Sequence, residues 1–86
     1  MDINYDPRKA ASNKRKHGIG FDEAQTALLD ERALVREDID HEEQRFILLG
    51  MSSQLRLLVV IYTVQNEIIR LISARPATQS EERYYG

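Results

Sequence analysis

Basic and aromatic side chains are the groups in this sequence best suited to chemistry. They are Lys16, His17, Arg45, Tyr62, Arg70, Arg75 and Tyr84. Cleavage of an RNA phosphodiester needs a base for the 2′-hydroxyl, an acid for the leaving oxygen and cations on the phosphate. Histidine transfers protons near neutral pH, and the arginine fork matches two phosphate oxygens. These residue types therefore favour phosphodiester cleavage that needs no metal ion.

Signatures of other hydrolytic sites are missing from the sequence. The chain has no cysteine, and no spacing links His17 with His41 as metal ligands. Its four glycines are scattered and form no phosphate-binding loop. Residues 50–53 begin like a serine-nucleophile motif but lack its closing glycine. We therefore expect no metal site, no cofactor, and no hydrolase of the serine, cysteine or zinc type.

Two of the candidates also suit structural roles. His17 directly precedes Gly18, so its side chain would cap a helix end or, as a cation, interact with the helix dipole. Arg70 would form a surface ion pair with the acidic segment 37–43. Both interpretations stay open beside the catalytic one.

The spacing of the two strand arginines restricts how they act together. Arg70 and Arg75 lie an odd number of positions apart, so a regular strand would point them to opposite faces. They share a site only if Arg75 lies beyond the strand or a β-bulge shifts the register. Arg75 also precedes Pro76 at a predicted strand end, where functional side chains gather.

Length and composition predict one domain over residues 1–86 in the cytoplasm. This length has room for a single core. The lack of cysteine fits a reducing compartment, the N-terminus has no apolar signal core, and no apolar run is long enough to span a bilayer. The net charge of −2 lacks the basic excess usual in nucleic-acid-binding proteins. An RNA-binding surface must therefore come from an uneven distribution of charge.

The strongest structural signal is an apolar hairpin over residues 55–75. Residues 57–62 predict a strand that is covered on both faces at the centre of a sheet. Residues 63–67 predict the turn, with Asn66 able to take the left-handed conformation. Residues 68–74 predict the second, antiparallel strand.

Helix signals precede the strands. Residues 3–5 suit a short edge strand or a packing anchor. The pair Asp6–Pro7 predicts the cap and first residue of a helix that ends at Gly18. A second helix is predicted to begin at Phe21 and to end near Asp30.

The remaining segments complete a sheet. Residues 33–36 and 45–49 predict two more strands, with an acidic loop over residues 37–43 between them. Thr78 and Glu81 form a capping box that predicts a short C-terminal helix. The prediction is an α+β fold: two N-terminal helices packed on a four-stranded antiparallel sheet, with a short C-terminal helix and one sheet face partly open.

Short motifs spread over nearly the whole chain form one pattern. The N-terminal part holds Tyr5-Asp6-Pro7, Lys9-Ala10, Asn13, Lys16-His17-Gly18-Ile19 and Phe21-Asp22-Glu23-Ala24. The C-terminal part holds Arg45-Phe46, Leu49-Gly50, residues 57–63, residues 69–77, Glu81 and Tyr84. The Lys-His-Gly and Ile-Ser-Ala-Arg elements are its most specific parts. In this combination the sequence resembles the BrnT toxin family.

The resemblance implies a compact RelE-like fold and a ribonuclease toxin of a bacterial type II toxin–antitoxin system, an endoribonuclease that cleaves RNA and inhibits translation. It implies a BrnA-like antitoxin with a ribbon–helix–helix module as partner. That antitoxin neutralises the toxin, and the complex reaches operator DNA through it. Carried over to this sequence, the resemblance implies that Lys16, His17, Arg70 and Arg75 are catalytic and that Arg45 and Tyr84 bind RNA.

Two functions of different classes fit these residues. In the first, RNA lies across the open sheet face, Arg70 and Arg75 hold a phosphate, His17 or a tyrosine moves protons, and Lys16 stabilises charge. In the second, the chain is a non-catalytic module that binds the antitoxin and acts as co-repressor. The negative net charge and the lack of a clear acid–base pair favour the second function.

Overall fold

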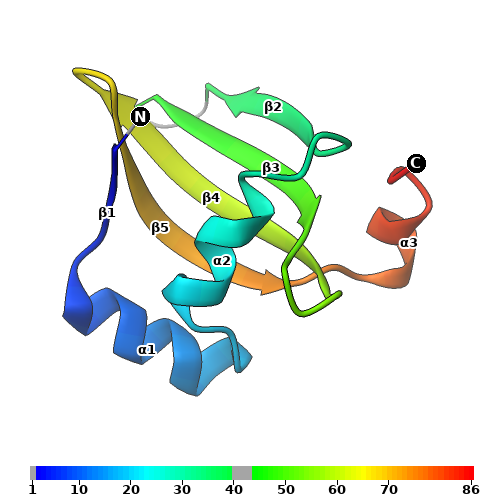
Figure 1. Ribbon diagram of the computed structural model, residues 1–86, viewed down its shortest axis with the longest axis horizontal. Coiled ribbons are helices and arrows are strands. Elements are labelled where there is room, and N and C mark those ends of the chain that lie inside the picture. Colours follow the sequence, from blue (N-terminus) through cyan, green and yellow to red (C-terminus); the bar gives the residue numbers. More distant parts are fainter. Residues whose placement is uncertain (1, 40–43) are drawn as a thin grey trace.

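A five-stranded sheet with two helices packed on one face forms the framework of the chain (Figure 1). It is seen in a computed structural model that describes residues 2–39 and 44–86. The elements in chain order are β1 (Asp2–Asn4), α1 (Pro7–His17), α2 (Phe21–Ala27), β2 (Leu34–Asp38), β3 (Arg45–Met51), β4 (Leu57–Gln65), β5 (Ile68–Pro76) and α3 (Gln79–Glu82).

The sheet has the order β1-β5-β4-β3-β2. Its pairs are antiparallel except that of β1 with β5, which is parallel. The α+β class is therefore confirmed, and the predicted four antiparallel strands are corrected to five with one parallel pair. The added strand β1, Asp2–Asn4, overlaps residues 3–5, for which a short edge strand was one of the two predictions.

The apolar hairpin is confirmed, with β4 as the central strand. Leu58 and Val60 are fully buried, and Val59, which faces the other side of the sheet, is 4% exposed. The turn is tighter than predicted, because β4 continues to Gln65. Only Asn66 and Glu67 remain for the turn, and both have positive φ angles, of 53° and 65°.

The first helix has the predicted ends. The Asp6 carboxylate accepts a hydrogen bond from the Arg8 backbone N–H at 2.8 Å, and Gly18 ends α1 with a φ of 73°. The second helix stops at Ala27, three residues before the predicted end at Asp30. Gly50 of β3 lies against this helix end, where an added Cβ would be 2.8 Å from the Ala27 carbonyl oxygen. The close approach of α2 to the sheet therefore requires glycine.

The core lies between the sheet and the helices α1 and α2. Its members are apolar residues of the α1–α2 segment and of the three central strands: Ile19, Phe21, Ala24, Ala27, Leu48, Leu58, Val60, Tyr62, Leu71 and Ala74. Tyr5 contacts the Phe21 ring edge to face at 5.3 Å, which agrees with its predicted role as a packing anchor.

The outer strands and α3 follow the sequence signals closely. β2 covers residues 34–38, so part of the predicted acidic loop is strand, and residues 40–43 of that loop lie outside the described residues. β3 extends two residues further than predicted, to Met51. The capping box between Thr78 and Glu81 is present. In the described ranges, no helix has the length and apolar character needed to cross a membrane.

Candidate functional site

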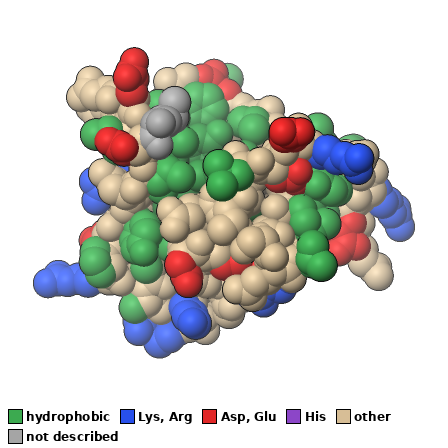
Figure 2. Space-filling view, viewed as in Figure 1, with side chains coloured by type: hydrophobic (Ala, Val, Ile, Leu, Met, Phe, Trp, Pro, Cys, Tyr) green, Lys and Arg blue, Asp and Glu red, His purple; other side chains and the backbone are tan. Residues whose placement is uncertain are grey.

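The sheet face opposite α1 and α2 carries four arginines. Residues paired directly across antiparallel strands share a face, so the register fixes which side chains lie together. Three cross-strand rows define this open face: Arg70-Thr63-Arg45-Asp38, Ser73-Ile61-Ile47-Arg36 and Arg75-Val59-Leu49-Leu34. Figure 2 shows the opposite, helix-bearing side, where lysine and arginine side chains lie toward the margins.

Arg70 and Arg75 share the open face because β5 contains a bulge. The pairing of β4 with β5 shifts between Ile61 and Tyr62, which leaves Ile72 as an extra residue on β5. The extra residue cancels the odd spacing of the two arginines. The residues of β4 that pair with Arg70 and Arg75 are Thr63 and Val59, which are four positions apart. The backbones of the two arginines are therefore about 13 Å apart. They therefore reach neighbouring parts of one extended ligand.

The Arg75 guanidinium is held by α3. Its Nη1 and Nη2 atoms donate to the two carboxylate oxygens of Glu81 at 2.7 and 2.8 Å. Nη1 also donates to the Pro76 carbonyl oxygen at 3.2 Å. The hydrogen bonds from Arg75, followed by that from the Thr78 backbone N–H, lower the pKa of Glu81 to about 2. The ion pair also raises the pKa of Arg75.

Arg45 and Arg70 flank Thr63 in one row of the open face. Two strand spacings separate their backbones, about 10 Å. Arg70 is exposed, and no described residue forms an ion pair or a side-chain hydrogen bond with it. The Arg45 Nε atom is buried, and it has no hydrogen-bond partner among the described residues. This row thus holds an exposed cation, Arg70, and a partly buried one, Arg45, which lies directly across from the Asp38 carboxylate.

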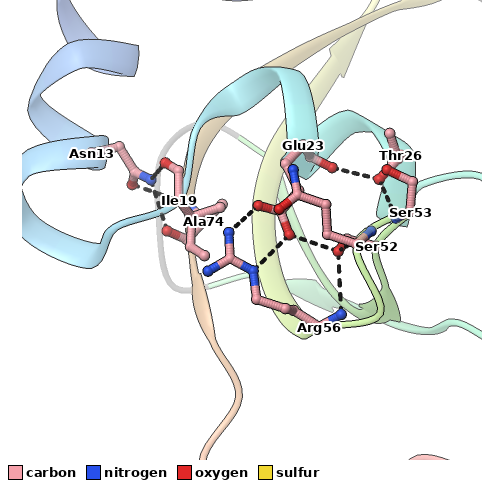
Figure 3. A network of polar contacts seen from close by, with 9 residues as sticks. Asn13, Ile19, Glu23, Thr26, Ser52, Ser53, Arg56 and Ala74 are labelled. Atoms are coloured by element: carbon pink, nitrogen blue, oxygen red, sulfur yellow. Dashed lines mark hydrogen bonds and ion pairs between the residues drawn. The ribbon is translucent and has the colours of Figure 1, made fainter.

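Asn13 attaches α1 to the edge of β5 (Figure 3). Its amide nitrogen donates to the Ala74 carbonyl oxygen at 2.8 Å and to the Ile19 carbonyl oxygen at 3.0 Å. Its amide oxygen accepts from the Ala74 backbone N–H at 3.0 Å. The buried side chain therefore pairs with β5 as a peptide unit of another strand would. This contact places the C-terminal half of α1 beside the bulge.

Lys16 and His17 line a hollow between α1 and β5. Its volume is about 220 Å³, and its lining also includes Ser73, which belongs to the open face. Ser73 stands between Arg70 and Arg75 along the strand. Of the four predicted catalytic residues, Lys16 and His17 line this hollow, whereas Arg70 and Arg75 do not line it and lie on either side of Ser73 along β5. The full lining is Lys9, Ser12, Asn13, Lys16, His17, Ile72 and Ser73.

Tyr84 lies at the other end of the open face. Its side chain is 76% exposed and lines an apolar groove of about 430 Å³. The residues of this apolar groove are Leu34, Val35, Arg36, Ile47, Leu49, Val59, Glu81 and Tyr84. Tyr62, by contrast, is a core residue stacked on Phe46, and burial raises its pKa. Tyr62 is therefore remote from both hollows.

Two residues of the open face that could contact a phosphate were not among the sequence candidates, namely Arg36 and Ser73. Arg36 is an exposed residue of β2, and Ser73 lies within the Ile-Ser-Ala-Arg motif. Strand alternation would have placed Arg36 on the side of Leu34, but only the register with β3 shows which side is open.

A buried ion pair elsewhere was also not predicted. The Glu23 carboxylate, 3% exposed, is bound by Arg56 and by the Ser52 hydroxyl at 2.7 Å (Figure 3). The hydrogen bond from Arg56 is the main cause that lowers the pKa of Glu23. The network attaches the β3–β4 turn to α2. Within residues 2–39 and 44–86, no three His, Cys, Asp or Glu side chains gather as metal ligands.

Comparisons with known proteins support the pattern seen in the motifs. The family described as "Ribonuclease toxin, BrnT, of type II toxin-antitoxin system" matches residues 5–81. The crystal structure of the Brucella abortus ribonuclease toxin BrnT is similar to this chain, with 28% sequence identity and a TM-score of 0.69. The similarity covers 92% of this chain and 99% of that chain. Comparison with curated proteins gave no match. The chain belongs to the BrnT family of ribonuclease toxins of type II toxin–antitoxin systems.

Proposed function

We propose that this chain is a metal-independent endoribonuclease that cleaves RNA and thereby inhibits translation. The observation that carries the proposal is the meeting of two basic surfaces at Ser73. The hollow with Lys16 and His17 lies on one side of Ser73, and Arg70 and Arg75 flank it along β5. Membership of a ribonuclease toxin family supports RNA as the substrate.

In the proposed reaction, single-stranded RNA crosses the edge of β5 at Ser73. His17 accepts the proton of the 2′-hydroxyl, whose oxygen attacks the neighbouring phosphorus. The bond from phosphorus to the 5′ oxygen breaks, and that oxygen takes the proton from the protonated His17, because none of the described tyrosines lines the hollow. A 2′,3′-cyclic phosphate and a 5′-hydroxyl are the products. Lys16 and Arg70 stabilise the charge that develops on the phosphate.

Arg75 can take part although Glu81 already binds it. A guanidinium carries five N–H donors, and three hydrogen bonds of Arg75 go to Glu81 and to the Pro76 carbonyl. Two N–H groups remain for a phosphate oxygen. The Arg75 side chain is 39% exposed, so a ligand on the open face can reach it.

Family membership implies an antitoxin partner. We propose that this partner is a BrnA-like protein with a ribbon–helix–helix module, which neutralises the toxin and brings the complex to operator DNA. The net charge of −2 fits a toxin that reaches DNA only through its partner. A cytoplasmic location is part of this proposal, because translated RNA and operator DNA are both found there.

The ion pair between Arg75 and Glu81 favours a second function, that of a non-catalytic co-repressor. Because Glu81 neutralises Arg75, one of the four open-face arginines offers less charge to a phosphate. In this alternative the chain binds its antitoxin and acts as co-repressor without cleaving RNA. Growth and RNA integrity separate the two functions.

The test is induced expression of the native chain and of Arg75→Ala, with growth and total RNA followed together. Purified protein is then incubated with single-stranded RNA in excess chelator, and the product ends are identified. Growth arrest with RNA loss, cyclic phosphate ends and relief by Arg75→Ala are expected. Lys14→Ala is the matched control, since Lys14 is an exposed α1 cation that does not line the hollow. Normal growth with a folded native chain would favour the co-repressor.

A further inference from the structure

The floor of the apolar groove is formed by three neighbouring strands. Leu34 of β2, Leu49 of β3 and Val59 of β4 form one cross-strand row, and Ile47 belongs to the next. Leu34 is 45% exposed, Leu49 and Ile47 are half-buried, and Val59 is 4% exposed, so the floor is open mainly on the β2 side. The groove volume of about 430 Å³ falls within the range of small-ligand sites, roughly 300–1,000 Å³.

The wall of the groove is an exposed aromatic ring on an anchored backbone. Tyr84 is 76% exposed, yet the residues around it are fixed at two points. Glu81, three residues before it, is bound by Arg75. Tyr85, the next residue, donates a hydrogen bond from its hydroxyl to Asp30. In Figure 1, α3 lies at the right, beyond the C-terminal end of β3 and apart from α1 and α2. Tyr84 is therefore held in place while its ring stays free.

The charges around the groove match a polyanion that carries aromatic bases. Arg36 lines the groove and is exposed, and Arg75 occupies the row that holds three floor residues. The one carboxylate of the lining, Glu81, is neutralised by Arg75. A protein partner would need an apolar side chain for the floor and a carboxylate beside it for Arg36. A nucleobase attached to phosphates uses both features.

We propose that the apolar groove binds one unstacked nucleobase of single-stranded RNA, with its ring stacked on Tyr84 and an adjoining phosphate on Arg36. Aromatic side chains are the usual platforms for splayed-out RNA bases. Ile47 lies in the same row as Ser73, two strands away, a distance of about 10 Å. The bound base is therefore a neighbour of the cleaved phosphodiester. This inference rests on the proposed function and names a subsite of the same surface.

The experiment measures dissociation constants for two short oligonucleotides of equal length. One is 2′-O-methyl oligouridine, which cannot be cleaved because its 2′ oxygen is blocked. The other has the same backbone without bases. The native chain is compared with Tyr84→Ala and Tyr84→Phe. Leu29→Ala, a change of a 78% exposed apolar residue outside the groove lining, is the matched control.

Tyr84→Ala is expected to weaken binding of the base-bearing oligonucleotide by about 5- to 150-fold. Binding of the abasic oligonucleotide should stay unchanged, and Tyr84→Phe and Leu29→Ala should bind both as the native chain does. Equal weakening for both oligonucleotides, or none, overturns the nucleobase site, while RNA cleavage by the native chain still supports the proposed function. Antitoxin binding is measured in parallel, and a Tyr84→Ala chain that loses it while binding both oligonucleotides as the native chain does would assign the groove to a protein and also overturn the proposal. If the native chain neither binds nor cleaves RNA, both ideas fail.

Discussion

Arg70 and Arg75 point to the same side of the sheet although they are five positions apart on β5. The extra residue at the bulge, Ile72, reverses the alternation between them. Ser73 follows the bulge directly and joins the open face to the hollow of Lys16 and His17. The bulge thus puts Arg70 and Arg75 on one face of the sheet, with Ser73 between them along β5. A regular strand would have put the two arginines on opposite faces.

Arg75 has two roles to distinguish, its proposed contact with phosphate and its ion pair with Glu81. Arg75→Ala should lower RNA cleavage about 10- to 100-fold, since a hydrogen bond to a charged group contributes about 1.5–3 kcal/mol. Its cost in stability should be only about 0.5–1 kcal/mol, because both partners are partly exposed. Cleavage rates and urea unfolding measure the two effects.

Glu81→Gln is the control for that prediction. It removes the same ion pair but keeps the cation, so cleavage should be retained or should rise. If Glu81→Gln reduces cleavage as much as Arg75→Ala does, Arg75 acts by holding α3 and not by contacting phosphate.

The Asn13 side chain should be a main determinant of stability. Asn13→Ala leaves the buried backbone groups of Ala74 and Ile19 without their partners. We expect a loss of roughly 2–4 kcal/mol in the free energy of unfolding. The urea midpoint should fall with little change in the slope. Lys14→Ala, on the exposed side of the same helix, should stay within about 0.5 kcal/mol of the native chain. Equal effects of the two substitutions would contradict a special role for Asn13.

The two-residue hairpin turn contains a conformational strain that glycine would relieve. Glu67 has a φ of 65°, which disfavours residues with a Cβ, whereas Asn-Gly is preferred in such turns. Glu67→Gly should raise the free energy of unfolding by about 0.5–1 kcal/mol and Tm by about 2–8 °C. Glu67→Ala removes the same charge but keeps the Cβ, so it should give no gain. A gain in Tm that Glu67→Ala matches would show that charge, not backbone strain, is responsible.

Acid should weaken the attachment of α3. The folded-state pKa of Glu81, about 2, lies below its ordinary value of 4.5. The unfolded chain therefore binds more protons between these values, so the stabilisation is fully present above pH 4.5 and is lost as the pH falls toward 2. Urea unfolding across this window should show a smaller decrease for Glu81→Gln than for the native chain. Glu82→Gln, at an exposed neighbouring position, should follow the native profile. A native-like profile for Glu81→Gln as well would rule out this ion pair as the cause.

Local signals predicted both ends of α1, the start of α3 and the central hairpin. Asp6, Pro7 and Gly18 define α1, and Thr78 with Glu81 begins α3, because each cap needs only residues that are close in sequence. The length of the hairpin turn was overestimated. Residues 63–65, Thr-Val-Gln, were predicted to belong to the turn, but all three pair with β5, and Thr63 also pairs with β3.

The site residues could be selected from short motifs, but their arrangement in space depends on contacts between segments far apart in the sequence. The motifs selected Lys16, His17, Arg70 and Arg75, and the odd spacing of the arginines indicated that either a bulge or a strand ending before Arg75 would be needed for a shared site. The presence of that bulge could not be read from sequence, because register depends on contacts between distant strands.

By itself, the sequence determined the element types, their caps, the central apolar strands and the family pattern, since these depend on neighbouring residues and on residue type. Only the tertiary structure decided the parallel pairing of β1, the bulge at Ile72, the pairing of Asn13 with β5, and the position of Tyr84 beside the apolar groove. Each of these joins segments far apart in sequence. Their geometry follows from satisfying backbone hydrogen bonds and packing the core at the same time.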